Sequence, residues 1–223
     1  MTFAAAYEDP PRAWGVGRVE NAAGITPWPV SQHDIDDEAA SLAPRLAELG
    51  LGDGGLILIV SLLSQAIHVV PLERAAGILG ARYSSADATP FDAFRTVSLV
   101  RQLGPTVVLG IDERVCDGIT ELGRELGDVF AGVSSVVAAD AAATRRIGRA
   151  GIAVARWLRI GPTSVFAGPG ADAFVYDARR WQLDEADGEL VLTNVAERLT
   201  PCRRLPTGWW GTVLEPGRVR IDA

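Results

Sequence analysis

The sequence predicts an α/β protein in which a parallel sheet is flanked by helices and followed by a β-rich C-terminal portion. Between residues 31 and 158, short apolar runs alternate with helix-length amphipathic segments. This alternation is typical of strands joined by helical crossovers that cover both faces of a parallel sheet. After residue 160 the apolar runs are short and separated by Gly, Pro and Asp, which favours further strands.

The division of the chain follows from these patterns. Residues 1–19 carry Pro and Gly and are expected to form an irregular N-terminal arm that packs on the body. Residues 20–160 are expected to form the α/β domain, and residues 161–223 the β-rich C-terminal portion.

Helix and strand signals in the first half begin at Ser31, which has the N-cap position of a helix, with Asp34 placed as in a capping box. Gly50 ends this helix, and the apolar run 56–60 is expected to be a buried strand. Residues 64–81 predict a helix with Ser64 as its cap. Pro71 inside it favours a kink or a split.

The same alternation continues to residue 158. Thr89 followed by Pro90 begins a helix that stops at Gly104. We expect the remaining helices and strands at residues 106–110 (strand), 112–126 (helix), 133–139 (strand), 140–150 (helix) and 152–158 (strand). In the C-terminal portion we expect strands at 164–167, 173–176, 189–193, 212–214 and 219–221.

Composition excludes several classes of function. The chain has 21 basic residues, all of them Arg, against 28 acidic ones, so its net charge is −7. Nucleic-acid and anionic-membrane binding need clustered basic groups, and the arginines here are scattered. An Arg-only, Ala-rich composition fits a GC-rich coding genome.

Localisation is predicted to be cytoplasmic. The two cysteines, Cys116 and Cys202, have no metal-ligand spacing and are expected to be reduced thiols. The N-terminal residues lack the pattern of a signal peptide. The longest apolar run, residues 56–60, is far shorter than the about 20 residues of a membrane-spanning helix.

Residues 188–211, GELVLTNVAERLTPCRRLPTGWWG, resemble the segment "GELV-x-T … P-x-x-R-Y-R-T-G-D" of adenylate-forming enzymes, nearest the phenylacetate–CoA ligase branch. Pro201, Arg204, Thr207 and Gly208 fall on matching positions. In the family the final Asp binds the ribose hydroxyls of ATP. Here that position is Trp209, whose indole has one donor and no acceptor.

Three further segments are similar to the same family. Residues 99–111 resemble the "LI-x-x-F-G-P-T-V-L" segment of phenylacetate–CoA ligases. Residues 22–29 align with the phosphate-binding loop "S-S-G-T-T-G-K-P", but Ala22 and Ala23 replace its serines and Trp28 replaces its lysine. Residues 160–164, IGPTS, align with "Y-G-P-T-E", and Ser164 replaces the glutamate that helps to hold magnesium.

The resemblance implies a trimmed version of the ligase large domain, without the family's mobile, lysine-bearing C-terminal domain. It also implies that ATP-dependent ligase activity is lost, because the groups that stabilise charge in adenylyl transfer are replaced together. We therefore expect no catalytic residue, no metal site and no cofactor. The expected remnant of the nucleotide or substrate cleft consists of Gly24, Thr26, Trp28, Gly161, Thr163, Ser164, Arg204, Thr207, Gly208 and Trp209.

The leading hypothesis is a non-catalytic protein that binds a ligand, such as a small organic acid or acyl compound, or another protein. The protein partner would be a second copy or an enzyme of the same pathway. One alternative is an enzyme of altered, ATP-independent chemistry on an acyl or aryl substrate, with Arg204 binding an anion and Thr163, Ser164 and His68 as polar partners. Another is a subunit that completes a partner's active site.

Several residues also have plain structural interpretations. The indoles of Trp28, Trp209 and Trp210 could line an apolar pocket or fill it, and filling is favoured. His68 is more simply a core or interface histidine, and Cys116 a small buried residue. The acidic clusters at residues 36–38 and 184–187 are expected to be solvated.

Overall fold

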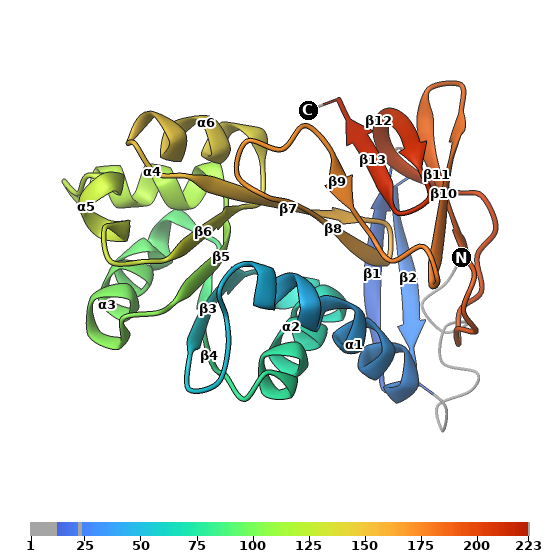
Figure 1. Ribbon diagram of the computed structural model, residues 1–223, viewed down its shortest axis with the longest axis horizontal. Coiled ribbons are helices and arrows are strands. Elements are labelled where there is room, and N and C mark those ends of the chain that lie inside the picture. Colours follow the sequence, from blue (N-terminus) through green and yellow to red (C-terminus); the bar gives the residue numbers. More distant parts are fainter. Residues whose placement is uncertain (1–12, 22–23, 223) are drawn as a thin grey trace.

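The computed structural model describes residues 13–21 and 24–222 of the chain. In this part the chain forms an eleven-stranded mixed sheet and a separate two-stranded hairpin (Figure 1). The strands are β1 (Gly15–Asn21), β2 (Gly24–Val30), β3 (Leu56–Ser61), β4 (Arg82–Asp87), β5 (Val107–Ile111), β6 (Ser135–Ala138), β7 (Val154–Ile160), β8 (Thr163–Ala167), β9 (Phe174–Val175), β10 (Trp181–Ala186), β11 (Glu189–Asn194), β12 (Leu205–Glu215) and β13 (Arg218–Ile221). The helices are α1 (Gln32–Glu48), α2 (Ala66–Ile78), α3 (Ala93–Leu103), α4 (Glu113–Glu121), α5 (Leu126–Phe130) and α6 (Ala141–Arg149), with 3₁₀ turns η2 (Leu63–Gln65) and η3 (Pro90–Asp92).

The parallel part of the sheet has the order β4-β3-β5-β6-β7. Alternate residues of β3 face opposite sides of it. Ile57 and Ile59 pack against α1 and α2, whereas Leu58 and Val60 pack against α3 to α6. Helices therefore cover both faces of the parallel sheet, as the sequence predicted.

The remaining strands are antiparallel and continue the same sheet in the order β7-β8-β9-β13-β12-β11-β10. Their side chains form a core of their own around residues such as Phe174, Trp181 and Leu192. The predicted β-rich C-terminal portion is therefore confirmed. Its strand β13 lies between β9 and β12 in the sheet, although it follows both in the sequence.

The predicted capping box at Ser31 and the predicted helix end at Gly104 are present, and the structure shows two further N-caps at α4 and α6. Ser31 and Asp34 form a capping box at the start of α1. Asp112 and Asp140 cap α4 and α6 through their carboxylates. Gly104 ends α3 with a left-handed backbone.

Two helices differ from the expectation. The helix after β3 begins after Gln65, so Ser64 lies in η2 and is not its cap. Pro71 lies inside α2 without splitting it; proline removes one N–H donor, and the buried Leu72 and Ala75 hold this helix on the core. The predicted helix 112–126 ends at Glu121, and residues 126–130 form the separate helix α5.

Four strands were not predicted. β4 and β10 lie at the two edges of the sheet. Most residues of β4 are exposed, so the strand has no apolar pattern. The strands β1 and β2 form a hairpin where an irregular arm and a loop were expected. Of the expected arm, residues 15–19 lie in β1, and residues 1–12 are outside the described part.

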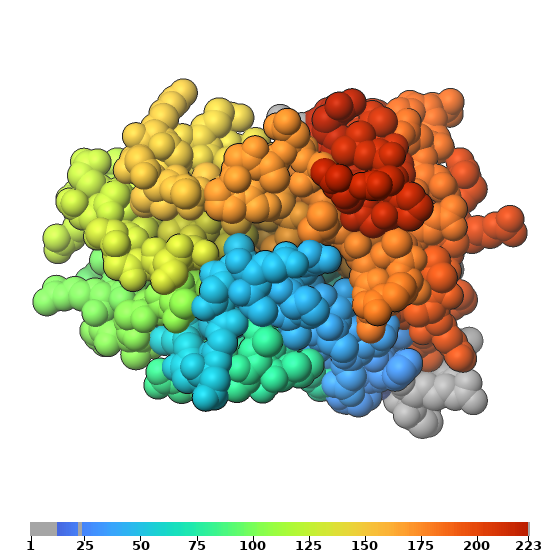
Figure 2. Space-filling model, viewed as in Figure 1, coloured from blue at the N-terminus to red at the C-terminus, as the bar shows by residue number. Residues whose placement is uncertain are grey.

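The β1–β2 hairpin is fixed to the body by a small apolar cluster. Val19 and Trp28 pack with Ile35 of α1 and Ile67 of α2. Gly17 is required at this contact, because a Cβ atom there would lie 2.1 Å from Cγ2 of Ile67. The space-filling view shows how closely the N-terminal segments (blue) and the C-terminal strands (orange) meet (Figure 2).

Both cysteines are free, as expected, and burial raises the pKa of the Cys116 thiol to about 12. None of the described helices combines the length and apolar character needed to cross a bilayer.

Candidate ligand-binding cleft

A cleft of about 660 Å³ opens at the carboxyl ends of the parallel strands. Residues that follow β3 (Leu62, Ser64 and Gln65) line it, together with Arg114 near the start of α4 and Arg159 at the end of β7. The chain leaves β3 toward β4 on one side and β5 lies on the other, so the cleft is at a change in the direction of strand order. Ligands of open α/β sheets bind at such points.

Elements far apart in the sequence complete the cleft. The hairpin contributes Arg18, Glu20 and Asn21, and β12 contributes Thr207, Gly208, Trp209 and Trp210. The turn between β7 and β8 contributes Gly161, which adopts a left-handed backbone with φ of 56°. The volume is within the range of about 300–1,000 Å³ that small-molecule sites occupy.

Three arginines line the cleft, and two of them have carboxylate partners. Arg18 pairs with Glu20 at 2.8 Å, and Arg114 pairs with Asp112 at 2.6 Å. Arg159 has neither a hydrogen bond nor an ion pair from its guanidinium to any of the described residues. Its guanidinium lies over the ring of Trp157, 5.2 Å from the centroid. Burial lowers the pKa of Arg159, but an arginine stays charged.

His68 of α2 lines the same cleft and is almost fully buried. Its Nδ1 lies 3.4 Å from Oγ of Ser164. Burial, and then the positive charge of Arg159, lower the pKa of His68 to about 3. The imidazole is therefore neutral at neutral pH.

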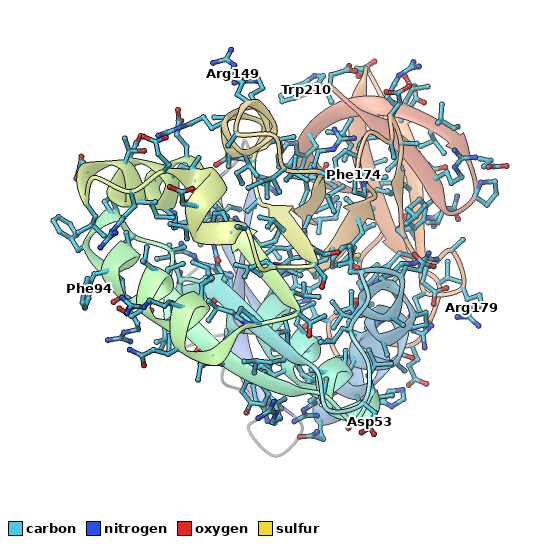
Figure 3. All side chains as sticks on the ribbon, turned by 60° about the vertical axis from the view of Figure 1, so that its left-hand side comes forward. Asp53, Phe94, Arg149, Phe174, Arg179 and Trp210 are labelled. Carbon is cyan, nitrogen blue, oxygen red and sulfur yellow. The ribbon has the colours of Figure 1, made fainter. Side chains whose placement is uncertain are left out.

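Two indoles form one wall of the cleft. Nε1 of Trp209 donates a 3.0 Å hydrogen bond to the carbonyl of Arg159, so the single donor of this ring is already used. Trp210 extends outward from β12 and is 51% exposed (Figure 3). The wall therefore presents aromatic surface beside Arg159.

The polar groups of the neighbouring motif are bonded within the protein. Thr207 donates its hydroxyl to the carbonyl of Leu190 at 2.7 Å, and its Oγ1 accepts from the N–H of Trp209. The N–H of Gly208 donates to the carboxylate of Glu189 at 2.8 Å. These groups support the shape of β12 and are not free for a ligand.

The structure separates the residues that the sequence grouped together. Gly161, Thr207, Gly208 and Trp209 line the cleft. The others lie elsewhere: Gly24 and Thr26 are exposed on the hairpin, Trp28 is buried beneath it, Thr163 and Ser164 line a smaller hollow beside α1, and Arg204 is exposed on the surface. Ala22 and Ala23 of the expected phosphate loop lie outside the described residues.

Thr163 belongs to a buried polar network between α1 and the C-terminal strands. At its centre, Glu38 accepts hydrogen bonds from Thr163 at 3.2 Å and from Nε1 of Trp181 at 2.6 Å. Burial raises the pKa of Glu38. The expectation that residues 36–38 are a solvated acidic cluster is therefore wrong for Glu38, which is 8% exposed.

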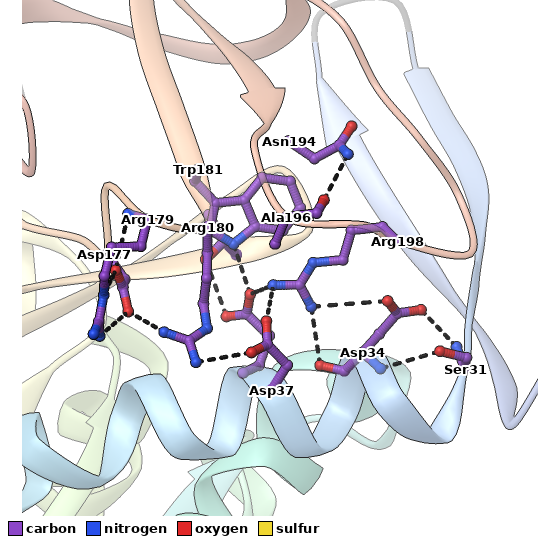
Figure 4. Close-up of polar contacts among 12 residues, drawn as sticks. Ser31, Asp34, Asp37, Asp177, Arg179, Arg180, Trp181, Asn194, Ala196 and Arg198 are labelled. Carbon is purple, nitrogen blue, oxygen red and sulfur yellow. Dashed lines mark hydrogen bonds and ion pairs between the residues drawn. The ribbon is translucent and has the colours of Figure 1, made fainter.

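Arg198 supplies the positive charge of this network (Figure 4). Its guanidinium donates to Glu38 at 2.7 Å, to Asp37 at 2.9 Å and to the backbone carbonyl of Asp34 at 3.0 Å. Arg180 extends the network by bridging Asp37 and Asp177. Hydrogen bonds from Arg179 hold the pKa of Asp177 well below its usual range.

Sequence reasoning missed Arg18, Arg114 and Arg159 as cleft residues. Arg18 reaches the cleft from the hairpin and Arg114 from α4, and no local sequence pattern predicts either placement. Arg159 had a usable signal, because it directly precedes the segment 160–164 that resembles a ligase motif.

No protein-family model matches the sequence, and no curated protein matches it. The structure does match solved ligases. A 2-hydroxyisobutyryl-CoA ligase in complex with 2-HIB-AMP and CoA matches 95% of this chain with a TM-score of 0.75 and 17% identity. The N-terminal subdomain of Klebsiella oxytoca NpsA, in complex with anthranilyl-AMSN, matches 93% with a TM-score of 0.64 and 11% identity. An anthranilate CoA ligase in complex with anthranoyl-AMP matches 92% with a TM-score of 0.62 and 13% identity.

These matches show that the chain has the fold of the large domain of adenylate-forming ligases. The chain spans about half the length of the solved proteins, 56% of the 2-hydroxyisobutyryl-CoA ligase and 46% of the anthranilate CoA ligase. The nearer resemblance to the phenylacetate–CoA ligase branch remains a prediction.

Proposed function

We propose that the chain is a non-catalytic protein with the ligase fold that binds a small organic acid or acyl compound in the cleft. The observation that carries this proposal is Arg159, a charged group beside an open cavity with no polar partner among the described residues. A desolvated charge without a partner lowers stability, and a ligand anion would remove that cost.

Two substitutions argue against the ATP chemistry of the solved ligases. Trp209 replaces the carboxylate that the family resemblance assigns to ribose binding, and its only donor is bonded to Arg159. Ser164 replaces the magnesium-binding glutamate, and its hydroxyl is buried beside His68. A neutral hydroxyl is a poor ligand for a hard divalent cation.

The test is a calorimetric titration of the chain with ATP–Mg²⁺ and with aryl and acyl carboxylates and their CoA esters, together with an ATP–pyrophosphate exchange assay. We expect heat from at least one organic acid, none from ATP–Mg²⁺ and no exchange. Exchange with any of the acids would show that the chain is a catalyst and would refute the proposal.

One observation favours a second candidate, an ATP-independent hydrolase. The Ser164–His68 pair has the residue types of a nucleophile and a base. Its geometry is unfavourable, because Ser164 does not line the cleft and a base with a pKa of about 3 is weak at neutral pH. Hydrolysis of p-nitrophenyl esters that is abolished in both Ser164→Ala and His68→Asn would support this candidate over the first.

A further inference from the structure

We propose that two copies of this chain associate through the edge strand β4, which pairs with β4 of a second copy in the antiparallel direction. The two-fold axis passes between the Ser84 residues of the two copies, and their sheets become one continuous sheet. This inference concerns assembly and does not rest on the proposed function. It depends on the free side of β4, on the difference between the two edge strands, and on exposed apolar side chains beside β4.

The first observation is that β4 is the last strand at one edge of the sheet in the part of the chain that the structure describes (Figure 1). The N–H groups of Arg82 and Ala88 both donate to carbonyls on the β3 side. Successive peptide groups of a strand point to opposite sides, so those of Tyr83 and Ser85 point away from β3. An edge strand with free N–H and C=O groups is a template for pairing with another chain.

The free stretch of this edge is short, and its length sets the register. The next N–H that points outward, that of Asp87, donates to the carboxylate of Asp92 at 2.8 Å. In an antiparallel pair, two residues with facing peptide groups exchange both N–H···O bonds. Tyr83 of each copy therefore exchanges its bonds with Ser85 of the other, and Ser84 lies opposite its own equivalent.

The charges of β4 fit this register. The pairing places Arg82 opposite Ala86 of the second copy and Asp87 opposite its Ala81, so no charged residue lies opposite a like charge. Because the strands are antiparallel, the basic end of each strand lies beside the acidic end of the other. This charge complementarity favours a second copy as the occupant of the edge.

The second observation is that the opposite edge strand carries charges that oppose such pairing, whereas the centre of β4 is uncharged. β10 contains Asp184 and Glu185, and an antiparallel pair of two β10 strands would bring the acidic residues of both copies together. The four central residues of β4 are Tyr-Ser-Ser-Ala, and its register with β3 continues without a bulge. The comparison therefore selects β4 as the edge for self-association.

The third observation is that exposed apolar side chains flank β4 at both ends. Ile78 lies at the end of the preceding helix and is exposed. Beyond the strand, Phe91 is 97% exposed, and Phe94 is 68% exposed at the periphery of the molecule (Figure 3). Antiparallel pairing brings the end of each copy that carries Ile78 toward the end of the other that carries Phe91. Burial of such side chains adds hydrophobic free energy to the hydrogen bonds of the strands.

The experiment is sedimentation velocity of the full chain over a wide range of protein concentrations. It compares the wild type, Ser84→Lys, Ser84→Glu and an equal mixture of these two variants. The wild type should have twice the 23.6 kDa mass of the single chain. Each variant alone should dissociate at least about tenfold more readily, because like charges then lie opposite each other on the axis. The mixture should recover the dimer, because opposite charges then meet.

Gln182→Lys is the matched control, because it adds the same charge at an exposed residue of β10. It should leave the mass of the dimer unchanged, and circular dichroism of each variant establishes that the folded protein is compared. A monomeric wild type overturns the proposal. A dimer that persists in both Ser84 variants, or that is lost equally in Gln182→Lys, also overturns it. Monomeric Ser84 variants that form no dimer on mixing refute the two-fold axis at Ser84.

Discussion

The polar network beside α1 and the cleft at the sheet edge both contain an arginine removed from bulk water, but they satisfy it differently. Arg198 of the network reaches Asp34, Asp37 and Glu38. Arg159 of the cleft lies against the Trp157 ring and has no hydrogen-bond or ion-pair partner in the described chain. Arg198 is needed by the folded protein itself, whereas Arg159 has unused donors beside open space.

The comparison teaches that membership of a ligase-like motif does not decide which residues of this protein face the cleft. Thr163 matches the ligase pattern, yet its hydroxyl is bonded to Glu38 of the network. Arg159 has no place in that pattern, yet it faces the cleft. The hydrogen-bonded hydroxyl of Thr163 contributes to stability, whereas the unpaired guanidinium of Arg159 is available to a ligand.

The largest effect is expected from Arg198→Met, which breaks the network. It leaves the buried carboxylate of Glu38 without its cation, whereas Asp37 keeps its ion pair with Arg180. Breaking a buried ion pair from one side costs about 3–5 kcal/mol of unfolding free energy. Urea unfolding measures this, with Arg179→Met, which removes an exposed arginine from the network rim, as control. A loss no larger than that of the control would contradict the role assigned to Arg198.

A smaller effect is expected from the pH dependence of His68. Its pKa is about 3 in the folded chain, against the ordinary value of 6.5 for a histidine side chain. Below pH 6.5 the proton therefore binds mainly to the unfolded chain. Stability is therefore full above pH 6.5 and falls as the pH decreases toward 3. Between pH 7 and pH 5 this contributes a loss of about 2 kcal/mol.

Urea unfolding of His68→Asn at pH 7 and pH 5 checks this prediction. The variant should show a smaller difference between the two pH values than the wild type. His33→Asn, at the exposed second histidine in α1, is the control. An unchanged pH difference in His68→Asn would mean that His68 titrates normally.

Thr163→Val tests whether a residue of the ligase-like motif that lies outside the cleft affects stability alone or also ligand binding. It removes the hydroxyl that donates to Glu38, and the loss of one hydrogen bond costs about 1 kcal/mol. Thr26→Val, at an exposed position of the hairpin, should not change the unfolding free energy measurably. Neither variant should alter the affinity of an acid for the cleft, as measured by calorimetry. Weakened binding in Thr163→Val would place this residue in the ligand site after all.

The smallest effect on stability is expected from Arg159→Met. The change removes a desolvated charge without breaking a hydrogen bond, so the unfolding free energy should stay within about 0.5 kcal/mol of wild type or rise. Ligand binding should fall in the same variant. A destabilisation comparable to that of Arg198→Met would make Arg159 a structural residue.

Much of the fold could be predicted because local chemistry specifies it. The caps at Ser31, Asp112 and Asp140 and the buried runs of β3 and β5 are fixed by neighbouring residues. The edge strands β4 and β10 were missed, because pairing on one side imposes little apolar pattern.

The site was harder to predict because it depends on contacts between distant residues. The sequence of its own helix predicts that Glu38 is solvated. Its burial depends on donors far away in the chain, above all Arg198, 160 positions later. Likewise, the sequence places Arg204 in a ligase motif but cannot show that its side chain is exposed. Which arginine remains unpaired is decided by the assembled fold.

The position of β13 has a consequence for how the protein is made. Residues Arg218–Ile221 form the strand that connects β9 to β12 within the sheet, and they follow the other described strands in the sequence. The parallel strands and both groups of antiparallel strands are therefore synthesised before the strand that joins the two groups. The strand β12, which carries Trp209 and Trp210, can pair with β13 only after residues 218–221 have been synthesised.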